Sequence, residues 1–311
     1  MYREGLPQLS AGETFITDGG METTLLFENG IDLPYFASFP LMDDPDGIRA
    51  LREYYESYVA MARAHGVGLV LDSPTWRASS DWGTLLGYSA EGLADVNRRG
   101  VELLEELREA GDGTRLVISG CIGPRGDGYQ IGQAMSPEQA ESYHEAQIST
   151  FAETTADLVT AYTLNYADEA VGVVRAAARA GIPSVISFTV ETDGRLPSGQ
   201  ALNDAIAEVD GETDGAAAYF MVNCAHPTHF EHVLADGGLE RVRGLRANAS
   251  SKSHAELDEA EELDQGDPKE LAERYRSIRA LLPNVTVVGG CCGTDQRHVA
   301  EIAAVWATSS V

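Results

Sequence analysis

Short apolar runs alternate along this chain with longer segments in which apolar residues recur every three or four positions. Apolar or β-branched runs of about four to eight residues predict buried strands, and the longer periodic segments predict amphipathic helices. Eight strands are expected, over residues 14–18, 66–71, 115–120, 157–163, 184–190, 217–223, 241–248 and 285–289. Eight helices are expected between and after them, over residues 47–65, 89–110, 136–151, 166–180, 201–209, 227–236, 268–281 and 296–306. This alternation predicts parallel strands joined by crossover helices.

Local signals mark several of these helix ends. Ser136 before Pro137 and Asp267 before Pro268 each combine a capping side chain with a proline suited to the first helical turn. Gly66 and Gly181 follow alanine-containing helical segments and lead directly into strands, as glycines at helix C-termini do.

Eight βα units without a Pro- or Ser-rich linker favour a closed (β/α)8 barrel over an open doubly wound sheet. Residues 1–311 are therefore expected to form one domain. The segment 250–267, SSKSHAELDEAEELDQGD, is too polar for a core and separates the seventh strand from its helix. We expect this insertion to be a solvated loop or an exposed helix whose charges face water.

Composition narrows the class of protein. Hydrophobic residues make up 43% of the chain, enough for a sizeable core and too many for a disordered chain. Acidic residues outnumber basic ones 49 to 22, and the net charge of −27 disfavours nucleic acid and anionic membranes as partners. No apolar run reaches the roughly 18 residues of a membrane span, and the first residues lack a signal-peptide pattern. We expect a cytoplasmic protein with reduced thiols, whose oligomeric state, homo-oligomers included, stays open.

The cysteines carry the clearest chemical signal. In a (β/α)8 barrel, reactive residues lie where strands end, and alternate strands contribute to the same layer. Cys224 ends the sixth expected strand, and Cys291 and Cys292 end the eighth, so their side chains can converge. Three thiolates and one open position are typical of a catalytic Zn²⁺ site. The glycines around the Cys-Cys pair, in the run GGCCG, would allow the strand to break so that both thiols face one ion.

Other candidates keep more than one interpretation. Cys121, after the third strand, fits a packing role or a redox role. His226 and His229 could form a metal pair, although the proline between them suggests a loop that enters a helix. The Asp18-Gly19-Gly20 turn could be purely structural, or its carboxylate could hold a substrate ammonium while the glycine amides meet a carboxylate. A reversible disulfide between Cys291 and Cys292 would make the protein redox-responsive instead.

Six motifs, spread over almost the whole chain, resemble the homocysteine S-methyltransferase family of zinc-dependent barrels. They are DGGMET at 18–23, SGCIGP at 119–124, SFTVETDGRLPSGQAL at 187–202, VNCAHP at 222–227, RANAS at 246–250 and GGCCGT at 289–294. The family includes enzymes that use betaine or S-methylmethionine as donors, and the homocysteine modules of cobalamin-dependent methionine synthases.

The resemblance implies an activity and a set of site residues. Zinc ligands would be Cys224, Cys291 and Cys292, and a methyl group would pass from a sulfonium or ammonium donor to a zinc-bound thiol. S-Methylmethionine and S-adenosylmethionine are the preferred donors, while a betaine or an external methyl-carrying protein stays open. The substrate-binding residues implied in this sequence are Asp18, Gly19, Gly20, Tyr162, Asn223 and Asn248, with Asn223 also supporting the metal site. The chain has no G-x-G-x-x-G or P-loop motif that would add a nucleotide cofactor.

Two segments depart from the family pattern, and the one after the fourth strand bears most on the acceptor. Family members usually carry a glutamate after the fourth strand for the homocysteine ammonium, where this chain has Ala161-Tyr162-Thr163. Tyrosine is neutral at pH 7, so either Asp18 compensates or the acceptor is a thiol other than homocysteine. A slipped register would instead give the role to Glu153 or Glu169. The segment 72–76, DSPTW, departs as well.

The alternative function is a zinc- or thiol-binding protein of the same fold that has a different acceptor or transfers no methyl group.

Overall fold

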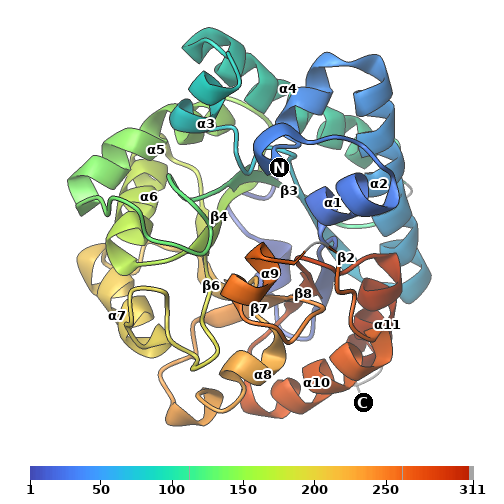
Figure 1. Ribbon diagram of the computed structural model, residues 1–311, viewed down its shortest axis with the longest axis vertical. Helices are drawn as coiled ribbons and strands as arrows, with labels where there is room; N and C mark the ends of the chain where they lie inside the picture. The colour runs from blue at the N-terminus through green and yellow to red at the C-terminus, as the bar shows by residue number, and fades with distance from the viewer. Residues whose placement is uncertain (112, 261, 308–311) are drawn as a thin grey trace.

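The computed structural model describes residues 1–111, 113–260 and 262–307, and these form a closed barrel of eight parallel strands (Figure 1). The strands follow one another round the barrel in chain order, and Phe15 of the first pairs with Val287 of the last. Their bounds are β1 Phe15–Ile16, β2 Gly68–Asp72, β3 Leu116–Ile122, β4 Leu158–Leu164, β5 Ser184–Phe188, β6 Tyr219–Asn223, β7 Val242–Ala247 and β8 Val287–Gly290. The predicted (β/α)8 barrel is therefore confirmed.

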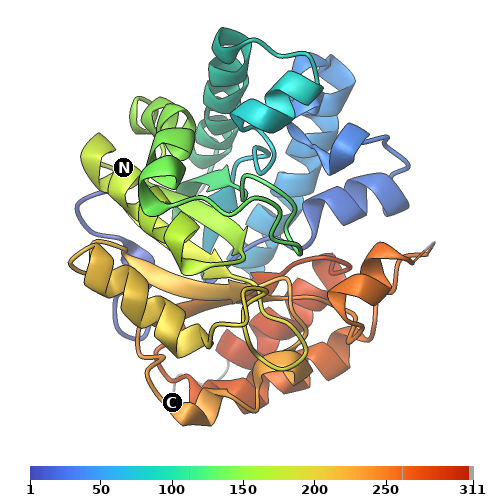
Figure 2. The same ribbon diagram turned by 60° about the vertical axis from the view of Figure 1, so that its left-hand side comes forward.

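Helices form the outer layer around these strands (Figure 2). The longer ones are α2 Pro45–His65, α4 Ala90–Glu109, α5 Pro137–Ala152, α6 Ala167–Ala180, α7 Leu202–Glu212, α10 Pro268–Leu281 and α11 Gln296–Ala307. Short helices lie in the loops: α1 Met21–Thr23, α3 Ser80–Leu85, α8 Pro227–Phe230 and α9 His254–Asp258, with 3-10 turns at Pro7–Leu9, Pro34–Phe36, Phe39–Asp43 and Leu234–Asp236 and a π turn at Thr24–Glu28.

The helix expected over residues 227–236 is wrong in extent. The α-helix ends at Phe230, and a separate 3-10 turn covers Leu234–Asp236. After Phe230 the backbone bonds span three residues instead of four, as from Val233 N to Phe230 O at 3.1 Å.

The predicted caps are confirmed: Ser136 and Asp267 accept hydrogen bonds from backbone amides, and Gly66 and Gly181 are left-handed, with φ of 65° and 71°.

Apolar side chains fill both faces of the strands, which is why the strand sequences read as nearly continuous apolar runs. An inner layer closes the barrel interior and includes Val70, Val117, Leu158, Val185 and Met221. A larger layer packs the outer faces of the strands against the helices. The interior is thus a packed core, and the polar residues are left for the ends of the strands.

The polar insertion of the seventh βα unit lies over the barrel mouth, where Figure 1 shows α9 near the centre of the ring of strands. We expected a solvated loop or an exposed helix, and the segment contains one short helix, His254–Asp258, within a longer loop. Its neighbourhood is not wholly solvated, however, because Leu257 and Leu263 line a cavity at the mouth.

Among the described residues, no helix combines the length and apolar character needed to cross a bilayer.

Candidate active site

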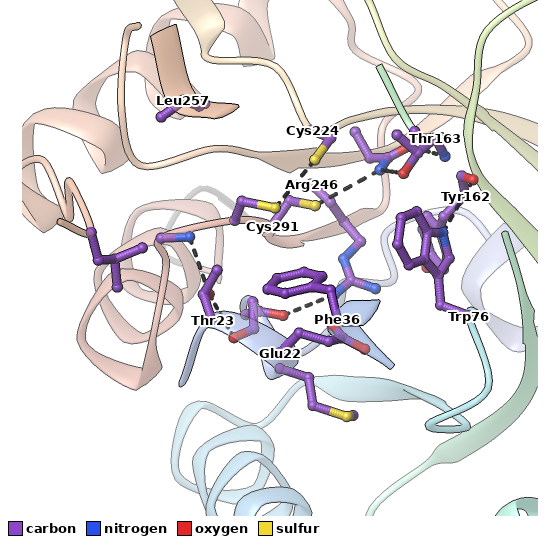
Figure 3. Close-up of a pocket in the computed structure, with 18 of the residues that line it drawn as sticks. Glu22, Thr23, Phe36, Trp76, Tyr162, Thr163, Cys224, Arg246, Leu257 and Cys291 are labelled. Carbon is purple, nitrogen blue, oxygen red and sulfur yellow. Dashed lines mark hydrogen bonds between the residues drawn. The ribbon is translucent and has the colours of Figure 1, made fainter. Parts of the chain in front are cut away.

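A cavity of about 380 Å³ opens where the strands end (Figure 3). Its walls come from the residues after β1, β2, β6 and β8, from the loop between β3 and α5, and from the insertion that carries α9. Strand ends and βα loops form the active sites of barrels of this type. The cavity is therefore the candidate active site.

Three sulfur atoms meet in this cavity. The Sγ atoms of Cys224, Cys291 and Cys292 all lie within 4.8 Å of one another, and those of Cys224 and Cys292 are 3.4 Å apart. The predicted convergence of β6 and β8 is confirmed. Hydrogen bonds donated by Cys224 and Cys292 hold the pKa of the Cys291 thiol well below its usual value. The group could hold a metal ion.

Backbone geometry around β8 brings both neighbouring cysteines to the same side. Gly290 allows close contact, because a Cβ atom there would clash with the side chain of Thr294. The Thr294 hydroxyl donates to the Cys291 carbonyl at 2.7 Å, and Gly293 has a φ of 77°. Cys224 is itself left-handed, with a φ of 58°. The turn expected from the GGCCG run is present.

Tyr129 is a neighbour of the sulfurs that the sequence did not reveal. Its hydroxyl lies 3.2 Å from Cys224 Sγ and 3.6 Å from Cys292 Sγ. Its ring stacks on His254 of α9, with ring centroids 4.0 Å apart. Tyr129 belongs to the long loop between β3 and α5 and stands in no motif, so only the folded loop places it here.

A buried charge network lies beside the sulfurs, and the sequence did not single out its centre, Arg246. The guanidinium bonds Asp18 Oδ1 at 2.5 Å and Asp72 Oδ2 at 2.8 Å. Tyr162 donates to the same oxygen of Asp72 at 2.8 Å, and Tyr54 donates to Asp18 at 3.1 Å. Burial raises the pKa of Asp18 to about 7 against the opposing charge of Arg246. Tyr162 thus supports a carboxylate on another strand.

The remaining predicted residues take different places. Gly19 and Gly20 line the cavity, and the Gly20 amide donates to the carbonyl of Thr294 at 2.9 Å. Asn223 lines it as well, and its Nδ2 lies 3.8 Å from Cys291 Sγ. Asn248 is buried outside the cavity lining, and its Oδ1 has no hydrogen-bond partner among the described residues. Cys121 lines the cavity apart from the sulfur cluster, and burial raises its thiol pKa.

The two histidines lie away from the cysteines. His226 Nδ1 contacts Thr228 Oγ1 at 2.8 Å and His229 Nε2 contacts the Ser251 carbonyl at 2.9 Å. Burial lowers the pKa of His226 to about 4. The metal-ligand geometry found among the described residues includes neither ring. As the proline between them suggested, His226 caps the short helix α8.

Neither glutamate of the slipped-register alternative reaches the cavity lining. Glu169 contacts His144 Nε2 at 3.0 Å and the backbone amide of Arg125 at 2.8 Å. Glu153 pairs with Arg98 on the outside of the barrel. Tyr162, by contrast, lines the cavity near the end of β4.

A sequence model of the homocysteine S-methyltransferase family matches residues 15–306. The chain belongs to this family. Membership makes the protein a methyltransferase and supports a role in homocysteine methylation. The family resemblance of the six motifs is confirmed.

Solved structures of the Escherichia coli homocysteine methyltransferase MmuM share the fold. The oxidized form superposes with a TM-score of 0.75 at 20% identity and covers 94% of this chain and 96% of its own. The metallated form gives 0.72 at 19% identity with the same coverage, and the apo form gives 0.68 at 20% identity, covering 95% and 96%. A search of curated proteins found no match.

Proposed function

We propose that this methyltransferase moves a methyl group from a sulfonium donor to a thiol acceptor at a zinc ion held by Cys224, Cys291 and Cys292. The observation that carries the proposal is the meeting of three cysteine sulfurs within 4.8 Å at the wall of the cavity. Three protein ligands around a tetrahedral ion leave one position for a substrate. Homocysteine or a related thiol is the proposed acceptor.

The donor set fits zinc. Zn–S bonds of about 2.3 Å place the sulfurs of a tetrahedral site roughly 3.8 Å apart, which agrees with sulfurs that are mutually within 4.8 Å. Thiolates are soft ligands that select zinc over Mg²⁺ or Ca²⁺. When bound, zinc would lower the pKa of an acceptor thiol, so that the thiolate is available near neutral pH. A metallated form of the E. coli relative is consistent with this assignment.

The walls of the cavity suit a cationic donor. Trp76, Phe36 and Tyr129 present aromatic surface, and Glu22 and Asp127 add negative charge. Both features attract an onium cation. We therefore favour S-methylmethionine or S-adenosylmethionine. The acceptor sulfur attacks the methyl carbon in line, the bond from that carbon to the donor sulfur breaks, and its electron pair stays on the departing neutral thioether. Alignment of the two substrates by the cavity supplies much of the acceleration.

Roles for the remaining predicted residues follow from their positions. Asn223 steadies the end of β6 and Cys291, since its amide also donates to Thr163 Oγ1 at 2.9 Å. We propose that Asp18, Gly19, Gly20 and Tyr162 form the wall behind the acceptor, and that Asn248, whose amide donates to the Ala225 carbonyl at 3.1 Å, supports the segment after Cys224. Four unpaired cysteines fit a reducing compartment such as the cytoplasm.

The test is metal content together with methyl transfer. Wild-type protein is expected to bind one zinc per chain, and Cys224→Ser to lose most of it, with a fall in transfer rate of about 100-fold or more. Cys121→Ser is the matched control, because Cys121 lines the same cavity outside the sulfur cluster, and it should keep its zinc. Full zinc content and unchanged turnover in Cys224→Ser would reject the proposal.

Tyr162 favours a second candidate acceptor, a thiol other than homocysteine, because the glutamate that usually binds the homocysteine ammonium in the family is missing here. A radiolabelled methyl-transfer assay with homocysteine beside other thiols separates the two acceptors. Labelled product with another thiol and none with homocysteine would favour the second acceptor.

A further inference from the structure

Two opposite charges on the cavity wall lack an ionic partner within the described part of the chain. Glu22 follows β1, and its Oε1 accepts a hydrogen bond from Ser38 at 2.8 Å, but no described cation pairs with it. Arg77 follows β2, and its guanidinium stacks on the rings of Trp76 and Trp82, at 4.6 Å and 3.9 Å from their centroids. Both residues line the same cavity.

Arg246 and its two aspartate partners already form a bonded network of their own. Arg246 joins Asp18 and Asp72, and its Nε and Nη2 also donate to the carbonyls of Gly290 and Gly19. The side chains of the two aspartates are only 4% and 5% exposed. Apart from Asp72 Oδ1, which has no hydrogen-bond partner among the described residues, the polar atoms of this network are bonded to one another, whereas Glu22 and Arg77 each lack an ionic partner there.

Arg77 shows this most clearly. Its Nε and Nη1 are buried and make no hydrogen bond with any described residue. Buried donors without acceptors and buried charges without partners are costly, and the cost disappears when a ligand supplies the partner. Burial lowers the pKa of Arg77, against the attraction of Asp127 and Glu22, and raises the pKa of Glu22, against its hydrogen bond from Ser38 and the attraction of Arg246.

We propose that Arg77 and Glu22 together bind the α-amino-acid end of a substrate, the α-carboxylate at Arg77 and the α-ammonium at Glu22. A zwitterion satisfies both side chains at once, and a guanidinium fork matches a carboxylate in geometry. The apolar faces of Trp76 and Phe36 beside them suit the carbon chain that leads to the sulfur. The inference rests on the proposed function, in which acceptor and sulfonium donor both carry such an end.

Binding of L-methionine to the zinc-loaded protein tests the subsite without methyl transfer. Calorimetry should show that wild-type protein binds L-methionine at least about tenfold more tightly than 3-(methylthio)propylamine or 4-(methylthio)butanoate. Arg77→Gln should remove the advantage over the amine, and Glu22→Gln the advantage over the acid. Glu53→Gln and Arg49→Gln on the exposed side of α2 are the charge-matched controls and should change nothing.

Steady-state rates then identify the substrate that uses the subsite. A rise of about tenfold in the KM of homocysteine in both site variants, with the donor KM unchanged, assigns the subsite to the acceptor, and the reverse assigns it to the donor. Wild-type protein that binds all three thioethers equally, or site variants that weaken all three alike, would overturn the inference even if methyl transfer is observed. Selective binding of L-methionine without methyl transfer would uphold the subsite and reject the proposed function.

Discussion

Tyr162 stands where the family pattern leads one to expect a carboxylate, and its contacts show what it does instead. Its hydroxyl donates to Asp72, which pairs with Arg246, and the Arg246 guanidinium lies 4.7 Å from the centre of the tyrosine ring. The departures at Tyr162 and at Asp72 are therefore parts of one arrangement. The sequence showed each departure, but their partnership across β2, β4 and β7 requires the closed barrel.

Tyr162→Phe should remove the hydrogen bond to Asp72 and keep the ring. We expect the free energy of unfolding in urea to fall by about 1.5–3 kcal/mol, because the acceptor is a buried charged group. Tyr143→Phe is the control, since its hydroxyl donates to a neutral acceptor, Ser79 Oγ, at 3.0 Å and its loss should cost only about 1 kcal/mol. Equal stability of Tyr162→Phe and wild-type protein would contradict the assigned role.

The turn after β8 is the element that makes the sulfur cluster possible. It also packs against the turn after β1: Gly290 N donates to the Asp18 carbonyl at 3.0 Å, and Gly20 N to the Thr294 carbonyl at 2.9 Å. The DGG and GGCCGT motifs are thus two halves of one junction where β1 meets β8 and the barrel closes.

Gly290→Ala tests this element. The added Cβ would clash with Thr294, whose hydroxyl holds the Cys291 carbonyl, so we expect a loss of about 1–3 kcal/mol in unfolding free energy together with weaker zinc binding. Gly126→Ala is a suitable control, because no described atom lies within 4 Å of a Cβ at that position. Retention of wild-type stability and metal affinity in Gly290→Ala would show that the turn tolerates crowding and would contradict this account.

The helices and strands could be predicted from the sequence where hydrophobic periodicity or a capping residue indicates them. All eight strands and seven of the eight expected helices are present near their expected bounds. The short helices α1 and α3 were not expected, and α9 was expected only as one alternative for the whole insertion, because a few residues carry no readable period and such turns depend on tertiary contacts. The helix expected over 227–236 stops early for the same reason.

The closed barrel brings residues that are far apart in sequence together in one site. Closure in chain order brings the ends of β6 and β8 together, so the sulfur cluster could be predicted from the strand positions and the glycines around Cys291 and Cys292. Loop conformation is not fixed in that way. Tyr129 and Leu257 enter the cavity because the β3–α5 loop and the insertion after β7 fold over the mouth, and Arg246 takes its role only once Asp18 and Asp72 lie on either side of it.

X-ray absorption spectroscopy at the zinc edge tests the central claim most directly. Zinc-loaded protein without substrates should show three sulfur ligands at about 2.3 Å, and added homocysteine should raise the count to four. Cys121→Ser should give the same spectra, since Cys121 stands outside the cluster. A first shell of nitrogen and oxygen alone, or a sulfur count that does not change when the thiol is added, would contradict the account.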